Sequence, residues 1–300
     1  MITRDILQAQ LFFIPEKEHK FYAQKMKLSI RSSSQTNNFL SASKRSTDTA
    51  SEEVSSSSSD GEERELCHAQ VKAFCRKEGI TLSREQSFRF EHFHSFNSIA
   101  TCEAIKNKHD NHYLNLKMEG DLVAQVQKKM MFPLDLRTKK EKAQVLYMQP
   151  SRYIPTATSS DSFIDNLCYV LNDMSRTEKQ CENGVAIVVN LKEYSRKNVH
   201  RDNSKRILQV IQGQMVPTKV AVVLFVDAPK VFRQIWKVMQ PFVSDALSKK
   251  VRFISDDKIG NYFEEGYQAY LPHEIASGWG SSTEMVEDYI DLKMFEDTQS

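Results

Sequence analysis

Four histidines gather in one part of the chain and are the first residues with side chains suited to chemistry. They are His92, His94, His109 and His112. Imidazole is a common zinc ligand, but a zinc site needs further ligands at matched spacing. Here no cysteine or carboxylate stands at ligand spacing on a shared helix face. We therefore expect structural histidines, no bound metal and no cofactor.

Carboxylates are the next candidates for catalytic residues. The pairs Asp256-Asp257 and Glu264-Glu265 are neighbours in sequence, so their side chains diverge and do not make an acid/base dyad. Asp227 ends an apolar run and is the best single candidate for a polar site, although it could simply cap the following helix. The chain has no GxGxxG turn after a strand, P-loop, GxSxG elbow or HExxH motif. We expect that the protein is not an enzyme.

Composition narrows the class of protein. The 300 residues carry 41 Lys and Arg against 39 Asp and Glu, so the net charge of +2 favours neither nucleic acid nor an acidic partner. No apolar run approaches the roughly 18 residues of a membrane span. The five cysteines show no CxxC spacing, which indicates reduced thiols and a cytoplasmic protein.

The elements that position these residues fall into four segments. Residues 1–65 form an N-terminal extension, largely a serine- and acid-rich linker that is expected to be disordered. Residues 66–131 predict a helical lobe, with a capping box at Ser83 and Gln86 and a last helix over 118–131. Residues 132–293 alternate strands with helices, and residues 294–300 are a tail.

The second lobe is organised around residues 217–254. A β-branched apolar run over 220–226 predicts a strand buried on both faces, followed by an aromatic helix and a strand over 251–254. Further strands are predicted at 145–148 and 185–191, with one long helix over 162–181 between them. This order predicts an α/β fold: a helical N-terminal lobe followed by a mostly parallel sheet flanked by helices.

Several short motifs recur in the order and spacing of one family. The motifs are Asp227-Ala228-Pro229 with Phe232 and Trp236, Gln240-Pro241-Phe242-Val243, the segment 191–195 after Gly184, and Leu271-Pro272 with Glu274. Together they resemble the CRAL-TRIO lipid-binding domain. That family includes fungal phosphatidylinositol-transfer, retinaldehyde-binding and tocopherol-transfer proteins. The resemblance runs from about residue 66 to residue 293.

The resemblance implies a hydrophobic lipid pocket, floored by the strands 185–191 and 220–226 and closed by a helical gate over 232–247. It assigns these residues to the pocket: Tyr147, Val185, Ile187, Val189, Leu191, Val220, Val222, Leu224, Phe232, Ile235, Trp236, Met239, Phe242 and Phe253. Thr218 and Lys250 are the possible polar contacts for a lipid headgroup.

Departures from the family pattern bear on the ligand. Thr218 stands where phosphatidylinositol-binding members have an acid, and Leu247 replaces a threonine ahead of the last strand. Val185 and Ile187 replace the serine and threonine of the choline-headgroup site. Because burying a phosphate diester requires several donors or a countercharge, these changes favour a less polar lipid.

Two functions remain open. The first is a lipid-binding and transfer protein, a cytoplasmic monomer in transient contact with membrane surfaces through basic residues such as Lys249 and Arg252. The second is a protein-interaction or signalling module that keeps the fold without lipid transfer. The second predicts a pocket filled by the protein's own aromatic side chains.

Overall fold

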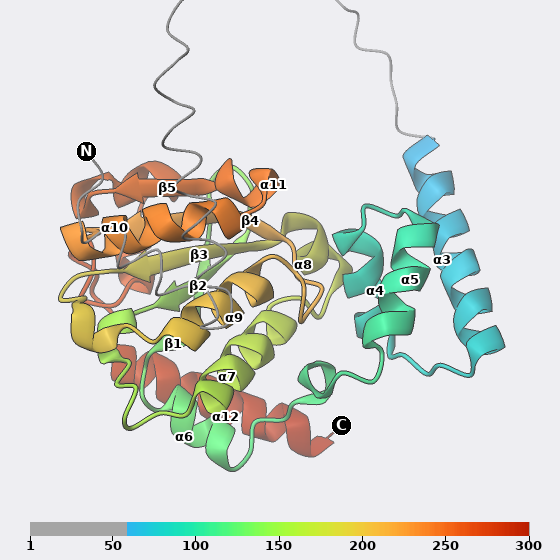
Figure 1. Ribbon diagram of the computed structural model, residues 1–300, viewed down its shortest axis with the longest axis horizontal. Helices are drawn as coiled ribbons and strands as arrows, with labels where there is room; N and C mark the ends of the chain where they lie inside the picture. The colour runs from blue at the N-terminus through green and yellow to red at the C-terminus, as the bar shows by residue number, and fades with distance from the viewer. Residues whose placement is uncertain (1–58, 300) are drawn as a thin grey trace, which may run out of the picture. The chain divides into compact units, whose positions relative to one another are not determined.

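Figure 1 shows a computed structural model of the protein, which describes residues 59–299. Contacts within the chain divide it into two units, Met1–Glu62 and Glu63–Ser300, and the sheet lies in the second. The predicted disorder of residues 1–58 concerns a segment outside the described residues. Helix α3 begins at Ser59, inside the segment that was predicted to be linker through residue 65.

The helices and strands alternate along the second unit after a helical start. The longer helices of the described part are α3 (Ser59–Glu78), α4 (Arg84–Phe93), α5 (Ser98–Lys108), α6 (Asp121–Val126), α7 (Ser160–Asp173), α8 (Glu178–Asn183), α9 (Arg201–Ile211), α10 (Lys230–Met239), α11 (Asp245–Ser248) and α12 (Ser282–Gln299). The strands are β1 (Met131–Arg137), β2 (Gln144–Met148), β3 (Val185–Asn190), β4 (Val220–Val226) and β5 (Val251–Ile254). Short 3₁₀ turns are η2 (His112–Asn115), η3 (Pro150–Arg152), η4 (Arg196–Asn198), η5 (Gln240–Phe242), η6 (Asp256–Tyr262) and η7 (Tyr267–Tyr270).

The five strands form one sheet in the order β1-β2-β3-β4-β5. β1 pairs antiparallel with β2, and every later neighbour is parallel, with a helical connection between consecutive strands. Every residue of β3 is buried, as is β4 apart from the partly buried Ala221, as expected for parallel strands covered on both faces. The predicted α/β fold with a mostly parallel sheet is confirmed.

Strand β1 was missed from the sequence, and the helix predicted directly before it, over 118–131, is wrong in its extent. The structure has only the short helix α6 there, and the chain enters the sheet at Met131. Pro133 lies within β1 opposite Leu146. Proline has no backbone N–H to donate, and an inner strand needs its N–H groups for hydrogen bonds to the neighbours on both sides. β1 tolerates proline because it is an edge strand with a neighbour on one side only.

The long helix predicted over 162–181 is two helices. Helix α7 ends at Asp173, and α8 starts afresh after Thr177, whose hydroxyl accepts a hydrogen bond from the backbone of Gln180 in a capping box. A cap residue at that position favours a new helix start over continuation. Gly184 ends α8 with φ +75°, and a Cβ there would lie 2.6 Å from the carbonyl oxygen of Lys219, so the chain can pass into β3 at this point only with glycine.

The helical lobe follows its local signals closely. The capping box predicted at Ser83 and Gln86 is present at the start of α4. Asn97, the residue before the predicted Ser98, caps α5. Arg89 on α4 is buried and donates to the carbonyl oxygen of Asn172 at the end of α7, which ties the lobe to the sheet-bearing part.

The end of the chain differs from the predicted tail over 294–300. Helix α12 continues through this segment to Gln299. Asp297 accepts hydrogen bonds from the backbone N–H of Met118 at 2.7 Å and from the Tyr169 hydroxyl at 3.2 Å. The last turns of α12 therefore belong to the folded core. No helix in the described range 59–299 is long and apolar enough to cross a membrane.

Candidate functional site

A small, mostly apolar cavity lies between one face of the sheet and the helices α9 and α10. Its volume is about 130 Å³, and its walls are almost wholly apolar. The structure also has two larger hollows, a groove of about 1070 Å³ beside α3 and α4 and another of about 710 Å³ beside β1 and α12. Both of these are lined by charged side chains of both signs, whereas the smaller cavity has mainly apolar walls of the kind that hold small ligands.

The predicted pocket residues of β3 and α10 come together at this cavity. The lining includes Ile187, Val189, Phe232, Ile235, Trp236 and Met239. On β3 the alternation of side chains places Ile187 and Val189 on the cavity face. On α10 the helical spacing brings Phe232, Ile235, Trp236 and Met239 to one side.

The predicted residues of β4 do not line the cavity, and two of them, Val222 and Leu224, lie on the opposite face of the sheet. Val220, Val222 and Leu224 were assigned to the pocket, but Val223 and Phe225 line the cavity. The pairing explains the difference, because Val185 lies opposite Val220 while Ala186 lies opposite Val222. One extra residue, Ala221, is thus inserted at the start of β4, and such a bulge turns every later side chain to the other face.

Other predicted residues also stand away from the cavity. Tyr147 points to the opposite face of the sheet, where its hydroxyl accepts from Asn190 at 3.0 Å. Val185 and Leu191 lie at the two ends of β3 and do not line the cavity, and Phe242 is 56% exposed in η5. Phe253 does not line it either, but packs behind it against Phe225 with ring centroids 5.1 Å apart.

An aromatic cluster fills most of the space under α10. Phe225 on β4 contacts Phe232 and Trp236 with centroid distances of 4.8 and 5.1 Å, and Tyr194 meets Phe232 edge-on at 5.5 Å. Trp236 is only 8% exposed. The predicted gate residues therefore occupy the interior themselves, and the free volume is what remains between them.

Several lining residues were missed from the sequence. They come from the end of β2, from α7, from the loop after β3 and from α9, and include Met148, Tyr153, Phe163, Tyr194, Ile207 and Ile211. The helical spacing of Ile207, Leu208 and Ile211 was a usable signal for the α9 side. No such sequence signal pointed to Tyr194, because its position depends on how the loop after β3 folds back.

Most polar groups around the cavity already have partners. Asn203 donates to the Tyr153 hydroxyl at 2.6 Å, Asn198 donates to the carbonyl oxygens of Ser151 and Tyr153, and Ser204 donates to the carbonyl oxygen of His200. The Tyr194 hydroxyl differs, because it has no hydrogen-bond partner among the described residues. Burial raises the pKa of Tyr194 to about 12, so the phenol is a neutral donor and acceptor at the cavity wall.

The two predicted headgroup contacts are not at the cavity. Thr218 is buried ahead of β4, and its hydroxyl has no partner among the described residues. Lys250 donates from Nζ to the carbonyl oxygen of Val220 at 2.6 Å. Burial and the neighbouring Lys219 lower the pKa of Lys250. Both residues lie near the starts of the parallel strands, whereas neither lines the cavity.

The predicted gate over 232–247 is broken into three pieces. Helix α10 ends at Met239, the turn η5 contains Pro241, and Ser244 caps the short helix α11. Hydrogen bonds hold the break itself, since Gln212 of α9 donates to the carbonyl oxygen of Phe242 and accepts from the N–H of Ser244. The outer side of α10 is exposed and basic, with Lys230, Arg233 and Lys237.

The remaining candidates for chemistry are Asp227 and the histidines. Asp227 does not cap α10; its carboxylate accepts from the N–H of Asp256 at 3.1 Å and joins the ends of β4 and η6. His92 and His94 are half-buried or buried, and burial lowers the pKa of both. Within residues 59–299 no group of three His, Cys, Asp or Glu residues is placed to hold a metal ion.

Comparisons with known proteins agree with the geometry. Residues 128–275 match the family model described as CRAL/TRIO domain. The crystal structure of Sfh5 is similar to this chain with a TM-score of 0.56 and 13% sequence identity, over 81% of this chain and 99% of that one. At this identity the likeness to Sfh5 shows the fold alone.

Proposed function

Residues 128–275 are a CRAL/TRIO domain, and from that premise we propose that the protein binds one small lipid or other hydrophobic ligand under α10. The observation that carries the proposal is a mainly apolar cavity with one hydroxyl, that of Tyr194, that has no partner among the described residues. Apolar walls supply affinity for a ligand, and a few placed polar groups orient it.

Ligand entry requires α10 to move. A cavity of about 130 Å³ is near the size that holds a single benzene ring and is too small for a lipid chain. Trp236 and Phe232 occupy the space that a longer ligand needs. Among the described residues, the one side-chain hydrogen bond of α10 runs from Arg233 to the carbonyl oxygen of Ala228, two residues before the helix. Apolar contacts and the stacking of Arg233 on the Phe253 ring, at 5.0 Å, hold the helix in place. A ligand can replace those contacts with its own.

The outer side of α10 suits a membrane surface. Lys230, Arg233 and Lys237 face outward, and the exposed ring of Phe242 follows them in η5. Each such cation is worth about 1 kcal/mol near an anionic bilayer. We propose that the protein is a cytoplasmic monomer that exchanges its ligand during transient contact of this side with membranes, with α10 as the gate.

The cavity favours a ligand with one weakly polar group over a phospholipid bound by its headgroup. Thr218 and Lys250 stand outside the cavity, and Tyr194 supplies a single neutral hydroxyl. A buried phosphate diester without a countercharge costs several kcal/mol. An alcohol, aldehyde or ketone needs only one hydrogen bond.

Native mass spectrometry of gently purified protein, with extraction and identification of what it carries, tests the proposal. We expect a ligand in about one-to-one ratio and transfer of that ligand between liposomes. Tyr194→Phe should weaken binding by about tenfold, the worth of one buried hydrogen bond, while Tyr270→Phe at an exposed site should not. A protein that is always empty and inactive in transfer would overturn the proposal.

One observation favours the second candidate, a protein-interaction module without lipid transfer. The protein's own aromatic side chains fill most of the space where a ligand would lie. If this packing is permanent, α10 should stay protected from hydrogen exchange as long as β4 does. If α10 is a gate, its amides should exchange much faster than those of β4.

A further inference from the structure

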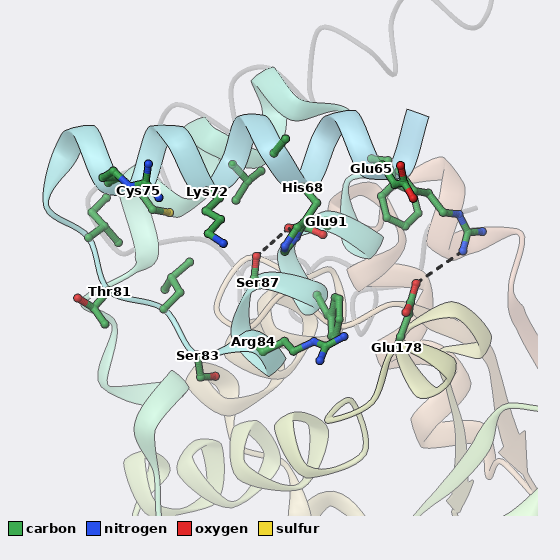
Figure 2. A pocket seen from close by; sticks show the side chains of 18 residues that line it. Glu65, His68, Lys72, Cys75, Thr81, Ser83, Arg84, Ser87, Glu91 and Glu178 are labelled. Atoms are coloured by element: carbon green, nitrogen blue, oxygen red, sulfur yellow. Dashed lines mark hydrogen bonds and ion pairs between the residues drawn. The ribbon is translucent and has the colours of Figure 1, made fainter. Parts of the chain in front are cut away.

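A groove larger than the proposed ligand cavity belongs to the helical lobe and takes no part in that cavity. It is the groove of about 1070 Å³ beside α3 and α4, which Figure 2 shows from close by. Its walls come from residues 64–76 of α3, the loop 80–83, residues 84–91 of α4, Phe96 and Glu178. None of these residues lines the cavity under α10.

The groove follows one face of α3 for several turns. The lining residues of α3 recur every three or four positions, from Arg64 through His68 and Lys72 to Arg76. At 1.5 Å per residue this face is about 18 Å long. The opposing wall repeats the same spacing on α4, with Arg84, Ser87, Phe88 and Glu91. The shape is a channel between helices rather than a small pit.

Two of the three carboxylates of the groove have hydrogen-bond or ion-pair partners. Glu91 is 2% exposed and accepts from the Ser87 hydroxyl at 2.7 Å, with His68 Nδ1 at 3.0 Å. Glu178 lies 3.9 Å from Arg64 and 3.8 Å from His92. Glu65, at the same end as these pairs, is exposed. The negative charges thus gather toward the start of α3.

Three further cations line the groove, two on α3 and one on α4. Lys72 and Arg76 stand one turn apart on α3, and Arg84 lies on α4 with its guanidinium 5.1 Å above the Phe88 ring. In the described part of the chain none of these three cations forms an ion pair with a carboxylate. Between them lie the apolar side chains of Val71, Ile80 and Leu82 and the Phe88 ring.

We propose that this groove binds an acidic, amphipathic peptide segment of a protein partner. Carboxylates of the peptide would meet Lys72, Arg76 and Arg84, and its apolar side chains would cover the floor, as in other helix-in-groove complexes. Charge complementarity argues for an acidic occupant. The channel shape argues for a peptide over a bilayer, because a planar membrane surface does not enter a groove between two helices.

A binding titration with the full-length protein tests this. The probe is a fluorescein-labelled peptide of about 12 residues, long enough for the groove if helical, with glutamates on one side and leucines at helical spacing on the other. We expect saturable binding tighter than about 100 μM. The triple variant Lys72→Glu, Arg76→Glu, Arg84→Glu should weaken binding by at least about tenfold.

The matched control carries the same charge change outside the groove: Lys77→Glu, Lys106→Glu and Lys117→Glu, all at exposed positions. It should bind the probe nearly as tightly as the unchanged protein. A peptide with serine in place of leucine should bind more weakly to every form, because it lacks the apolar contacts. Circular dichroism melts check that each variant is folded, and alanine replaces glutamate in the groove variant if it is not.

Three results would overturn the proposal. One is the absence of saturable binding of the acidic probe. Another is an equal loss of binding in the groove variant and the matched control, which would show a general effect of charge. The third is loss of binding to phosphatidylserine vesicles in the groove variant while the peptide is not bound by any form, which would assign these cations to a membrane surface.

Discussion

Tyr194 is the residue on which the proposed ligand chemistry depends. It follows β3 in the loop that leads to α9, and its ring packs edge-on against Phe232 of α10. Its hydroxyl therefore stands beside the helix that must move for a ligand to enter. A tyrosine can bind an alcohol or a carbonyl group equally well, because the neutral phenol both donates and accepts.

Tyr147 shows how a residue of the same type serves a different purpose on the other face of the sheet. It is fully buried, packs on Phe132, and its hydroxyl lies between Asn190 at 3.0 Å and Gln149 at 3.4 Å. Asn190 also donates to the carbonyl oxygen of Glu274. This small network joins β2 and β3 to the segment that follows η7.

The titration of Tyr147 makes a prediction about stability at high pH. Burial raises its pKa from 10 to about 12, so the folded state holds the proton more tightly than the unfolded state. The contribution is fully present below pH 10 and is lost as the pH rises through 12. At about pH 10.5 the loss amounts to roughly 1 kcal/mol in the free energy of unfolding.

Urea unfolding at about pH 8 and about pH 10.5 measures this effect. The fall in unfolding free energy should be about 1 kcal/mol larger for the unchanged protein than for Tyr147→Phe. Tyr270→Phe, at an exposed site, controls for the loss of a hydroxyl. Identical pH dependence of Tyr147→Phe and the unchanged protein would contradict the prediction.

At the scale of elements, the bulge at Ala221 decides which side of β4 faces the cavity. Local alternation from Val220 predicts Val222 and Leu224, whereas the pairing with β3 places Val223 and Phe225 there. The bulge adds no signal to the sequence, because Val220 to Val226 is apolar on both faces. A strand buried on both sides can shift by one residue without exposing a polar group.

Truncating one residue on each face of β4 tests this assignment. Phe225→Ala and Leu224→Ala should each destabilise the fold by about 3–4 kcal/mol, since both side chains are buried. Only Phe225→Ala should enlarge the cavity under α10 and strengthen binding of a small apolar fluorescent dye. Stronger dye binding by Leu224→Ala, with none gained by Phe225→Ala, would show that the register is wrong.

At the scale of the molecule, α12 holds distant parts of the second unit together. Lys293 and Arg176 both contact Asp173 at 2.9 Å and Glu296 at 2.8 and 2.9 Å, which joins α12 to the end of α7. Asp297 reaches the backbone of Met118, at the end of the helical lobe. The final helix therefore fastens the lobe to the sheet-bearing part through side chains beyond residue 293.

Removing residues 294–300 should consequently destabilise the protein, by about 3 kcal/mol, because the Tyr169 hydroxyl and Arg176 lose charged partners. A thermal or denaturant melt measures the change. Removing only residues 298–300 is the control, since it leaves Glu296 and Asp297 in place. Equal stability of the two truncated proteins would mean that the segment is the simple tail predicted from its sequence.

The sequence by itself determined the order of strands and helices from Gly184 to Ile254, the capping box of α4 and the apolar side of α10. These features are local, because burial on both faces, cap residues and helical spacing can be recognised from residues that are close together in the sequence. It also led, through short motifs, to the CRAL/TRIO family. About half of the predicted pocket residues on β3, β4 and α10 line the cavity.

Only the tertiary structure decided the rest. The proline-containing strand β1 can form because it lies at the edge of the sheet. Which side chains of β4 face the cavity depends on a bulge in its pairing with β3. Tyr194 reaches the cavity, while Thr218 and Lys250 do not. Each of these outcomes depends on a partner far away in the chain, and a pattern of neighbouring residues carries no information about such a partner.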